Sequence, residues 1–212
     1  MGTTWWAVAA TLGVLLGYEG LLFALQRRHP GRLARSAHAS LREQWFQAVT
    51  ELKGSEILAV QTLRNSLMSA TMLASTAALG LMGTLTLALP TLNAGFTAAP
   101  AALLTPRLTL ELALLLMLFG SLVATVMSVR FYHHAGYVAA LPVGSDARRR
   151  WGALGVAYLR KAGLLYSWGL RHLVLVVPVV AALLLPAAGP VAAVAAVTAL
   201  YLFDCVSDGP AG

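Results

Sequence analysis

Long apolar runs alternate along this chain with short stretches that carry most of its charge. A helix needs about 20 apolar residues to cross the roughly 30 Å hydrocarbon core of a membrane. Four of the runs are long enough. The pattern therefore predicts an all-α fold, a polytopic transmembrane helix bundle with four spanning helices plus a short fifth. We assign the spans to residues 1–26, 57–89, 108–141 and 164–186, and the short fifth helix to residues 191–206.

Two connecting segments, residues 27–56 and 142–163, show apolar positions at helical spacing instead of a continuous apolar run. This spacing predicts amphipathic helices on the cytoplasmic side. They either lie on the inner leaflet or extend the long membrane helices and pack on one another, and the pattern leaves both alternatives open. The apolar positions are Leu33, Ala37, Leu41, Trp45, Ala48 and Leu52 in the first segment and Trp151, Leu154, Tyr158, Ala162 and Leu165 in the second.

The composition excludes a water-soluble enzyme and a disordered chain, because 58% of the residues are hydrophobic and only 11% are charged. The mean hydropathy of +0.75 agrees with this conclusion. Cys205 is the single cysteine, which excludes an internal disulfide and thiolate metal centres. The sequence contains no phosphate-binding glycine loop, nucleophile elbow or HExxH motif, so we predict no catalytic residue and no metal site.

The net charge of +7 would suggest nucleic acid as a partner of a soluble protein, but the position of the charges excludes it. Twelve of the fifteen Lys and Arg residues fall in residues 26–56 and 130–163, and the connector 90–107 holds one, Arg107. Basic loops stay in the cytoplasm. We therefore predict a bacterial inner (plasma) membrane protein with its amino terminus outside and its basic loops cytoplasmic.

Polar side chains inside the apolar runs are the main functional signal, because a charge in hydrocarbon costs on the order of 2.5–3.5 kcal/mol. Counted at about 1.5 Å per residue, Glu19 and Asp204 lie roughly 20–22 Å from the outer surface. Arg171 and His172 lie about 9 Å inside the inner boundary by the same count, which is nearly the same plane. We predict that these four residues, contributed by three helices, form one polar layer.

A second polar layer is predicted near the inner membrane boundary, on one face of the second span and at the end of the third. Its members are Gln61, Arg64, Asn65, Arg130, His133 and His134. Together the layers form a vestibule open to the cytoplasm, in which three arginines face two acids. We expect an anionic group, such as a lipid phosphate, a carboxylate or a heme propionate, to balance this surplus.

Simpler roles exist for several of these residues. Arg64 and Arg130 can extend to the membrane surface along their aliphatic stems, and Glu19 with Arg171 can form a structural ion pair. His133 or His134 together with His172 can also supply axial ligands to a heme. Small residues recur every four positions in the first span, where they allow close packing either within the bundle or in a dimer. These small residues are Ala9, Gly13 and Gly17.

Several motifs resemble those of an uncharacterised bacterial and plant family of membrane proteins, known only as a domain of unknown function. The motifs are ILAVQTLRNSLMSATMLAST (57–76), RRHP followed by REQW (42–45), SVRFYHHAGYVAALP (128–142), GLRHLVLVVP (169–178) and YLFD (201–204). The resemblance spans nearly the whole chain and implies a polytopic membrane protein without an assigned activity. The positions that match the family pattern are Arg64, Asn65, Arg130, Arg171 and Asp204. His133 and His172 depart from it, which speaks against a heme or metal role shared by the family.

Three functions are compatible with this pattern of residues. The first is a non-enzymatic binding or accessory subunit that holds a lipid or anionic ligand in the vestibule, with membrane lipids, other membrane subunits or a second copy as partners. The second is a small transporter or channel that uses the layer of Glu19, Arg171 and Asp204. Inverted repeats and broken helices, which are typical of transporters, are not evident, so the first function is favoured. A heme-binding redox subunit is the third.

Overall fold

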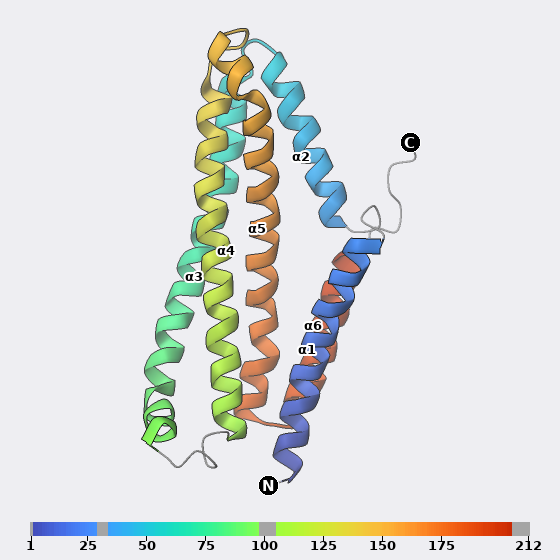
Figure 1. Ribbon diagram of the computed structural model, residues 1–212, viewed down its shortest axis with the longest axis vertical. Helices are drawn as coiled ribbons and strands as arrows, with labels where there is room; N and C mark the ends of the chain where they lie inside the picture. The colour runs from blue at the N-terminus through green and yellow to red at the C-terminus, as the bar shows by residue number, and fades with distance from the viewer. Residues whose placement is uncertain (1, 29–33, 98–104, 205–212) are drawn as a thin grey trace.

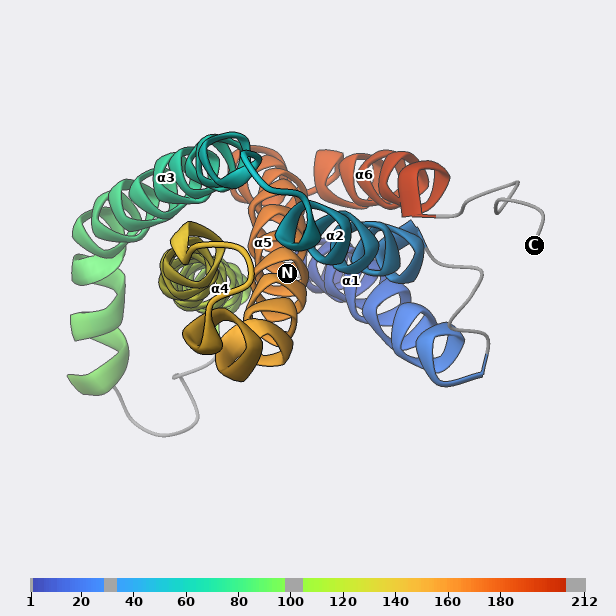
Figure 2. The ribbon, with the colours of Figure 1, turned by 90° about the horizontal axis from the view of Figure 1, so that it is seen from above.

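The computed structural model describes residues 2–28, 34–97 and 105–204, which fold into six α-helices with no β-strand among them (Figure 1). The helices are α1 (Gly2–Arg28), α2 (Ala34–Glu51), α3 (Glu56–Thr97), α4 (Pro106–Ala140), α5 (Asp146–Leu184) and α6 (Ala188–Asp204). Figure 2 shows α5 between α3 and α4 on one side and α1, α2 and α6 on the other. The predicted all-α class is confirmed.

The bundle has two ends that differ in which helices reach them (Figure 1). We call the end that holds the first residues of α1 the amino-terminal end, and the end with the α2–α3 and α4–α5 turns the hairpin end. Helices α3, α4 and α5 have 42, 35 and 39 residues and run from one end to the other. At about 1.5 Å per residue they are roughly 50–65 Å long, which exceeds the hydrocarbon core.

Among the described residues, four helices are long and apolar enough to cross a membrane. The qualifying segments are Thr4–Leu25, Glu56–Ala94, Pro106–Ala140 and Asp146–Leu184. Helix α6 has only 17 residues and starts beside α1 at the amino-terminal end (Figure 1). The predicted bundle of four spanning helices plus a short fifth is therefore confirmed.

Helices α4 and α5 make the most extensive contact in the bundle and form its frame. Small residues bring the two backbones together, since a Cβ on Gly169 would overlap the side chain of Thr125. At the same height the Ser121 hydroxyl donates to the carbonyl oxygen of Gly169 at 2.8 Å. Two turns away, the Ser128 hydroxyl donates to the carbonyl oxygen of Ala162 at 2.8 Å. Close approach and interhelical hydrogen bonds are what hold membrane helices together.

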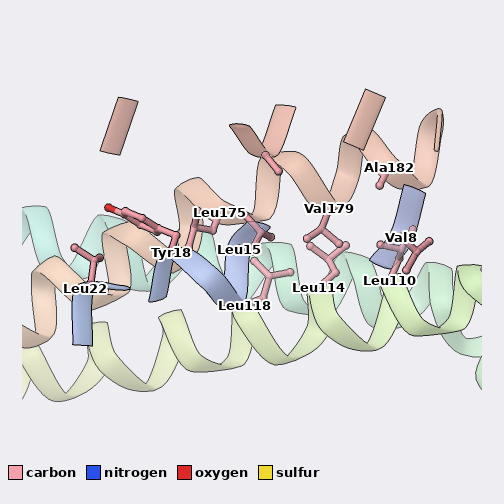
Figure 3. Close-up of a cluster of buried hydrophobic side chains, with 11 residues drawn as sticks. Val8, Leu15, Tyr18, Leu22, Leu110, Leu114, Leu118, Leu175, Val179 and Ala182 are labelled. Atoms are coloured by element: carbon pink, nitrogen blue, oxygen red, sulfur yellow. The ribbon is translucent and has the colours of Figure 1, made fainter. Parts of the chain in front are cut away.

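A first hydrophobic core fills the half of the bundle at the amino-terminal end (Figure 3). Helix α1 contributes residues spaced by seven, three and four, which places them on one face. The buried members are Val8, Leu15, Tyr18, Leu22, Leu110, Leu114, Leu118, Leu175, Val179, Ala182 and Ala193. The small residues Gly13 and Gly17 of α1 are exposed and have no neighbour within 4 Å of a built Cβ, so they do not pack within the described bundle.

A second hydrophobic core fills the half at the hairpin end, where α2 packs mainly on α5. Its largest fully buried side chain is Phe46 of α2, which is 1% exposed. A Cβ on Gly155 of α5 would lie 3.0 Å from two atoms of the Phe46 ring, so this glycine provides the space for the ring. The buried members are Phe46, Ala59, Leu63, Ala70, Tyr132, Ala135, Val138, Ala139, Leu159 and Ala162.

Helix α2 packs on the bundle with a different face from the one that its apolar pattern indicates. Leu41 and Leu52 belong to the predicted apolar face, yet they are 64% and 65% exposed. Ala39 and Phe46 are buried instead, and Arg42 lies between them on the same face. The reason is tertiary, because Gly155 on α5 leaves a hollow that fits the Phe46 ring. The buried face of α5 is also shifted from the predicted one. The apolar pattern assigns Tyr158 to that face, whereas the buried residue is its neighbour Leu159.

The docking face of α2 can be tested with a matched pair of variants. Phe46→Ala is expected to lower the free energy of unfolding by about 3–5 kcal/mol, because it removes a fully buried aromatic ring and leaves a cavity. Leu41→Ala, on the exposed face of the same helix, is expected to change it by less than about 1 kcal/mol. Chemical denaturation of the purified protein in detergent measures both values. Equal losses would contradict the packing of α2.

The α4–α5 turn is closed by a buried arginine. Arg148 is 5% exposed and its Nη1 donates to the carbonyl oxygen of Ala139 at 3.0 Å and to that of Leu141. These carbonyls end α4 and lack partners within the helix. Ser145 caps the start of α5, since its Oγ accepts a hydrogen bond from the Arg148 backbone N–H at 3.2 Å. Gly144 supplies the positive φ of +83° that the turn requires.

Helix boundaries differ from the sequence pattern at two places. Helix α3 continues through Pro90 to Thr97, although the pattern places a connector from residue 90 onward. A proline inside a helix removes one hydrogen bond, and packed membrane helices tolerate this loss. Helix α5 begins at Asp146, so the predicted amphipathic segment 142–163 is largely continuous with the fourth apolar segment. Residues 98–104 of the predicted connector lie outside the described residues.

Candidate functional site

An ion pair joins α5 to the end of α6. Nη2 of Arg171 lies 2.6 Å from Oδ2 of Asp204, and the hydroxyl of Tyr18 donates to the same oxygen at 2.6 Å. Arg171 is 4% exposed. The structure thus brings together two residues of the predicted layer, and it adds Tyr18, which the predicted layer did not include.

Glu19 is not part of this cluster, which is a correction to the predicted polar layer of four residues. Successive residues on a helix point about 100° apart, so Glu19 turns away when Tyr18 faces α6. Its Oε1 is buried and has no hydrogen-bond partner among the described residues. The His172 side chain contacts its own helix instead, since its Nδ1 lies 2.9 Å from the carbonyl oxygen of Trp168, one turn earlier on α5.

The second predicted layer does not gather inside the bundle. Gln61, Arg64 and Asn65 are exposed on α3, because Ala59 and Leu63 occupy the face that packs on the other helices. Arg130 and His133 of α4 are exposed as well, whereas His134 is half-buried with its ring centroid 5.3 Å from that of Tyr158. The vestibule predicted from Arg64, Arg130 and Arg171 is therefore not formed.

The predicted axial pair of histidines is also corrected by the geometry. A Cβ on Gly120 of α4 would lie 4.0 Å from His172, which fixes the height of His172 in the bundle. His134 lies fourteen residues further along α4. That spacing corresponds to about 21 Å. Because two axial ligands bind one iron from opposite sides, His134 and its neighbour His133 cannot pair with His172 on the same heme. No group of three His, Cys, Asp or Glu side chains within the described ranges is placed to hold a metal ion.

A half-buried arginine on α2 has the environment of a binding group. The guanidinium of Arg42 packs against Gly163 of α5, where an added Cβ would overlap its Cζ and Nε. This Nε is buried without a hydrogen-bond partner, and no carboxylate among the described side chains forms an ion pair with Arg42. The adjacent Glu43 binds Arg160 instead, at 3.3 Å. Burial lowers the pKa of Arg42 below its ordinary value, although an arginine keeps its charge in proteins.

Three cavities adjoin one another along α5, and Arg42 and Arg171 are among their lining residues. The first, of about 290 Å³, is lined by Leu41, Arg42, Trp45, Thr62, Leu63, Ser66, Tyr132 and Leu159. The second, of about 230 Å³, is lined by His38, Arg42, Gly163, Tyr166, Ser167 and Leu170. The third, of about 350 Å³, is lined by Ser167, Leu170, Arg171, Val174, Ala199, Leu200, Phe203 and Asp204. Because neighbouring cavities share lining residues, we call them together the α2–α5 groove.

Comparison with known proteins identifies the family. The family model described as "Protein of unknown function, DUF599" matches residues 6–209. This chain belongs to the DUF599 family. Searches of curated proteins and of solved structures give no match. The role of this DUF599 protein must therefore be inferred from its own geometry.

The groove of this DUF599 protein carries a surplus of positive charge. Asp204 is the one carboxylate among the described residues that line it, and Arg171 and Tyr18 already bind that carboxylate. Arg42 thus has no carboxylate within ion-pair distance among the described side chains, and His38 lines the same cavity. The remaining lining is largely apolar. A guanidinium beside an apolar cavity can bind a carboxylate or phosphate that carries a hydrocarbon chain.

Sequence reasoning missed Arg42 because it assigned α2 the wrong face. The available signal was the pair of glycines at residues 155 and 163, since residues eight apart on a helix share a face and small residues there admit side chains from a neighbour. For Tyr18, the signal was a phenol hydroxyl inside an apolar run, which needs a partner when it is buried.

Proposed function

We propose that this DUF599 protein is a non-enzymatic integral membrane protein that holds an anionic phospholipid in the α2–α5 groove, as an accessory or binding subunit. The observation that carries the proposal is Arg42, a guanidinium held between helices with a buried Nε that lacks a partner. A buried donor without a partner costs about 1–3 kcal/mol, and a bound phosphate removes that cost.

The groove has the right position and lining for such a lipid. Its third cavity ends at Asp204, beside the last turn of α6, and Arg42 contacts Gly163, eight residues along α5 from Arg171. Gly163 and Arg171 are thus separated by about 12 Å along α5, a distance that extends from the headgroup region of a lipid into its acyl chains. Leu170, Leu200 and Phe203 line the path that an acyl chain would take.

The transporter alternative has less support. It requires Glu19, Arg171 and Asp204 to act as one layer, and Glu19 lies outside the contact between the other two. The orientation with the hairpin end in the cytoplasm of a bacterial inner membrane belongs to the proposal. It is supported by the basic residues of the α4–α5 turn and the first turn of α5, namely Arg148, Arg149 and Arg150. In that orientation the groove faces the inner leaflet.

Lipid retention in native mass spectrometry tests the proposal. The purified protein is incubated with phosphatidylglycerol or with phosphatidylcholine of the same acyl chains. We expect the wild type to retain the anionic lipid, and Arg42→Gln to reduce that retention about tenfold, as the loss of a charged hydrogen bond predicts. Arg64→Gln, which removes an exposed arginine on α3, is the matched control and should retain the lipid.

Two outcomes would contradict the proposed function. One is unchanged phosphatidylglycerol retention in Arg42→Gln. The other is an equal loss in Arg64→Gln, which would mean that surface charge alone attracts the lipid. Arg42→Lys adds a further check, because an ammonium keeps the charge but cannot form the bidentate contact with phosphate. We expect its retention to fall between those of the wild type and the glutamine variant.

A further inference from the structure

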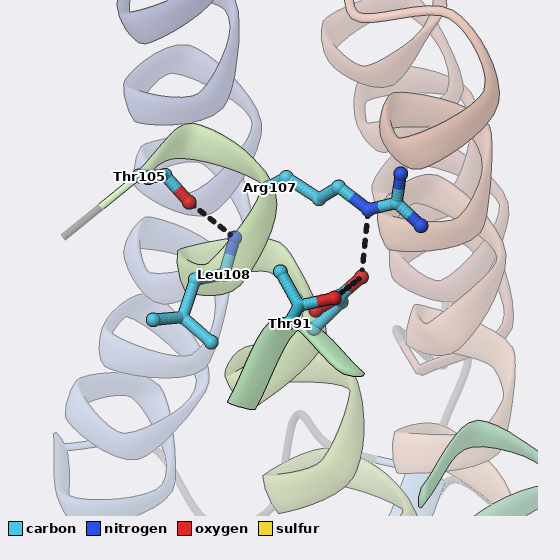
Figure 4. A network of polar contacts seen from close by, with 5 residues as sticks. Thr91, Thr105, Arg107 and Leu108 are labelled. Carbon is cyan, nitrogen blue, oxygen red and sulfur yellow. Dashed lines mark hydrogen bonds and ion pairs between the residues drawn. The ribbon is translucent and has the colours of Figure 1, made fainter. Parts of the chain in front are cut away.

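A second polar cluster lies at the opposite end of the bundle, where α4 begins (Figure 4). The Thr105 hydroxyl caps α4 by accepting a hydrogen bond from the backbone N–H of Leu108 at 3.1 Å. One turn later Nε of Arg107 donates to Oε1 of Glu111 at 2.8 Å, and the Thr91 hydroxyl of α3 donates to the same oxygen at 3.4 Å. The Glu111 side chain is only 6% exposed, so this cluster forms a carboxylate site buried between α3 and α4.

The second carboxylate oxygen of Glu111 is unused. Its Oε2 is buried and has no hydrogen-bond partner in the described part of the chain. Leaving such an acceptor unpaired is costly, since buried polar atoms are almost always hydrogen-bonded. Both protein donors bind the other oxygen, so the described part of the chain leaves the acceptor capacity of Oε2 unfilled.

A cavity of about 360 Å³ adjoins this carboxylate. Helices α3, α4 and α5 line it with Thr84, Leu87, Ala88, Arg107, Glu111, Leu114, Val180, Leu183 and Leu184. Apart from the Arg107–Glu111 pair and one threonine, the lining is apolar. The cavity therefore fits a hydrocarbon chain whose polar end carries an N–H donor for Glu111.

Arg107 determines which ligand charges fit this site. Its side chain is 71% exposed, and its two terminal nitrogens point away from the carboxylate (Figure 4). These nitrogens are therefore available to a phosphate while Nε stays on Glu111. Because Arg107 and Glu111 neutralise each other, a ligand with one positive and one negative group matches the site better than a net ion.

We propose that this cavity binds a zwitterionic phospholipid with a primary ammonium headgroup, such as phosphatidylethanolamine. The ammonium donates to Oε2 of Glu111, the phosphate contacts Arg107, and an acyl chain lies along the apolar lining. Glu111 is five residues after Pro106, about 8 Å from the start of α4, where lipid headgroups meet the ends of membrane helices. The inference is independent of the proposed function, which concerns the groove around Arg42.

Headgroup methylation provides a sharp test, because each methyl group removes one N–H donor without changing the charge. Retention by the purified wild-type protein is measured by native mass spectrometry for phosphatidylethanolamine, its monomethyl and dimethyl forms, and phosphatidylcholine with the same acyl chains. We expect retention to fall along this series, by about tenfold in total, as the loss of a charged hydrogen bond predicts. Equal retention of all four lipids overturns the proposal.

Variants then assign the preference to Glu111. Glu111→Gln is expected to abolish the preference for phosphatidylethanolamine over phosphatidylcholine, whereas Glu51→Gln at the exposed end of α2 should keep it. A Glu111→Gln protein that keeps the preference overturns the assignment, and the methylation series on the wild type decides the question if that variant does not fold. Arg42→Gln should leave this preference unchanged, which separates a failure here from a failure of the proposed function.

Discussion

Arg171→Met is expected to lower the free energy of unfolding by about 3–5 kcal/mol, as much as the removal of the buried Phe46 ring. The variant keeps the apolar stem of the side chain but leaves the carboxylate of Asp204 without its cation in a low-dielectric environment. Tyr18 still donates one hydrogen bond, which cannot replace a full positive charge. Chemical denaturation in detergent, followed by tryptophan fluorescence, measures the loss.

A second substitution distinguishes charge from packing in this cluster. Arg171→Met combined with Asp204→Asn removes both charges and keeps an acceptor for the Tyr18 hydroxyl. We expect the double variant to recover most of the lost stability, because a neutral pair avoids the desolvation of ions. Arg64→Met, on the exposed face of α3, is the control and should be close to the wild type. A double variant as unstable as Arg171→Met would show that the ion pair is not the cause.

Gly163→Ala is expected to reduce phosphatidylglycerol retention about tenfold or more, as Arg42→Gln does. Its methyl group would overlap the Arg42 guanidinium, so this end of a flexible side chain must leave its position against Gly163. The fold should tolerate the change, since alanine is favoured over glycine in a helix by about 1 kcal/mol. Binding and stability are therefore expected to separate in this variant.

Gly152→Ala is the matched control, because it makes the same substitution on the same helix at a position with no neighbour within 4 Å of the new Cβ. It should retain the lipid, and the change from glycine to alanine should stabilise the helix by the same amount as in Gly163→Ala. Native mass spectrometry measures retention, and thermal unfolding in detergent measures stability. If Gly163→Ala retained phosphatidylglycerol as well as Gly152→Ala does, the position of Arg42 against Gly163 would have no part in binding.

The two proposed lipid sites differ in the charge that they leave unpaired. Around Arg42 the unpaired group is a donor with a net positive charge, so an anion is preferred. Around Glu111 it is an acceptor within a neutral pair, so a zwitterion is preferred. They lie toward opposite ends of the bundle, since Arg42 lines a cavity together with residues of the core at the hairpin end, whereas Glu111 lies near the start of α4. Each preference can therefore be changed without the other.

Much of the fold could be predicted from the sequence, because membrane crossing depends on length and apolarity alone. Four long runs and a short fifth are visible in the chain, and most of the basic residues fall in the segments 26–56 and 130–163. The pair of Arg171 and Asp204 was also within reach, since counting residues along two helices places them at one height. These properties are local or additive, so they need no knowledge of how helices face each other.

The tertiary structure alone decided which side of each helix faces the bundle. Glu19 and Tyr18 are neighbours in the chain, yet Tyr18 binds Asp204, because rotation about the helix axis is set by packing and not by hydropathy. Packing likewise sets the rotation of α3, which turns Gln61, Arg64 and Asn65 outward. It also sets the rotation of α2, which brings Arg42 against Gly163 of α5. The cavities that support both proposals are each lined by at least two different helices, so no pattern along a single segment could reveal them.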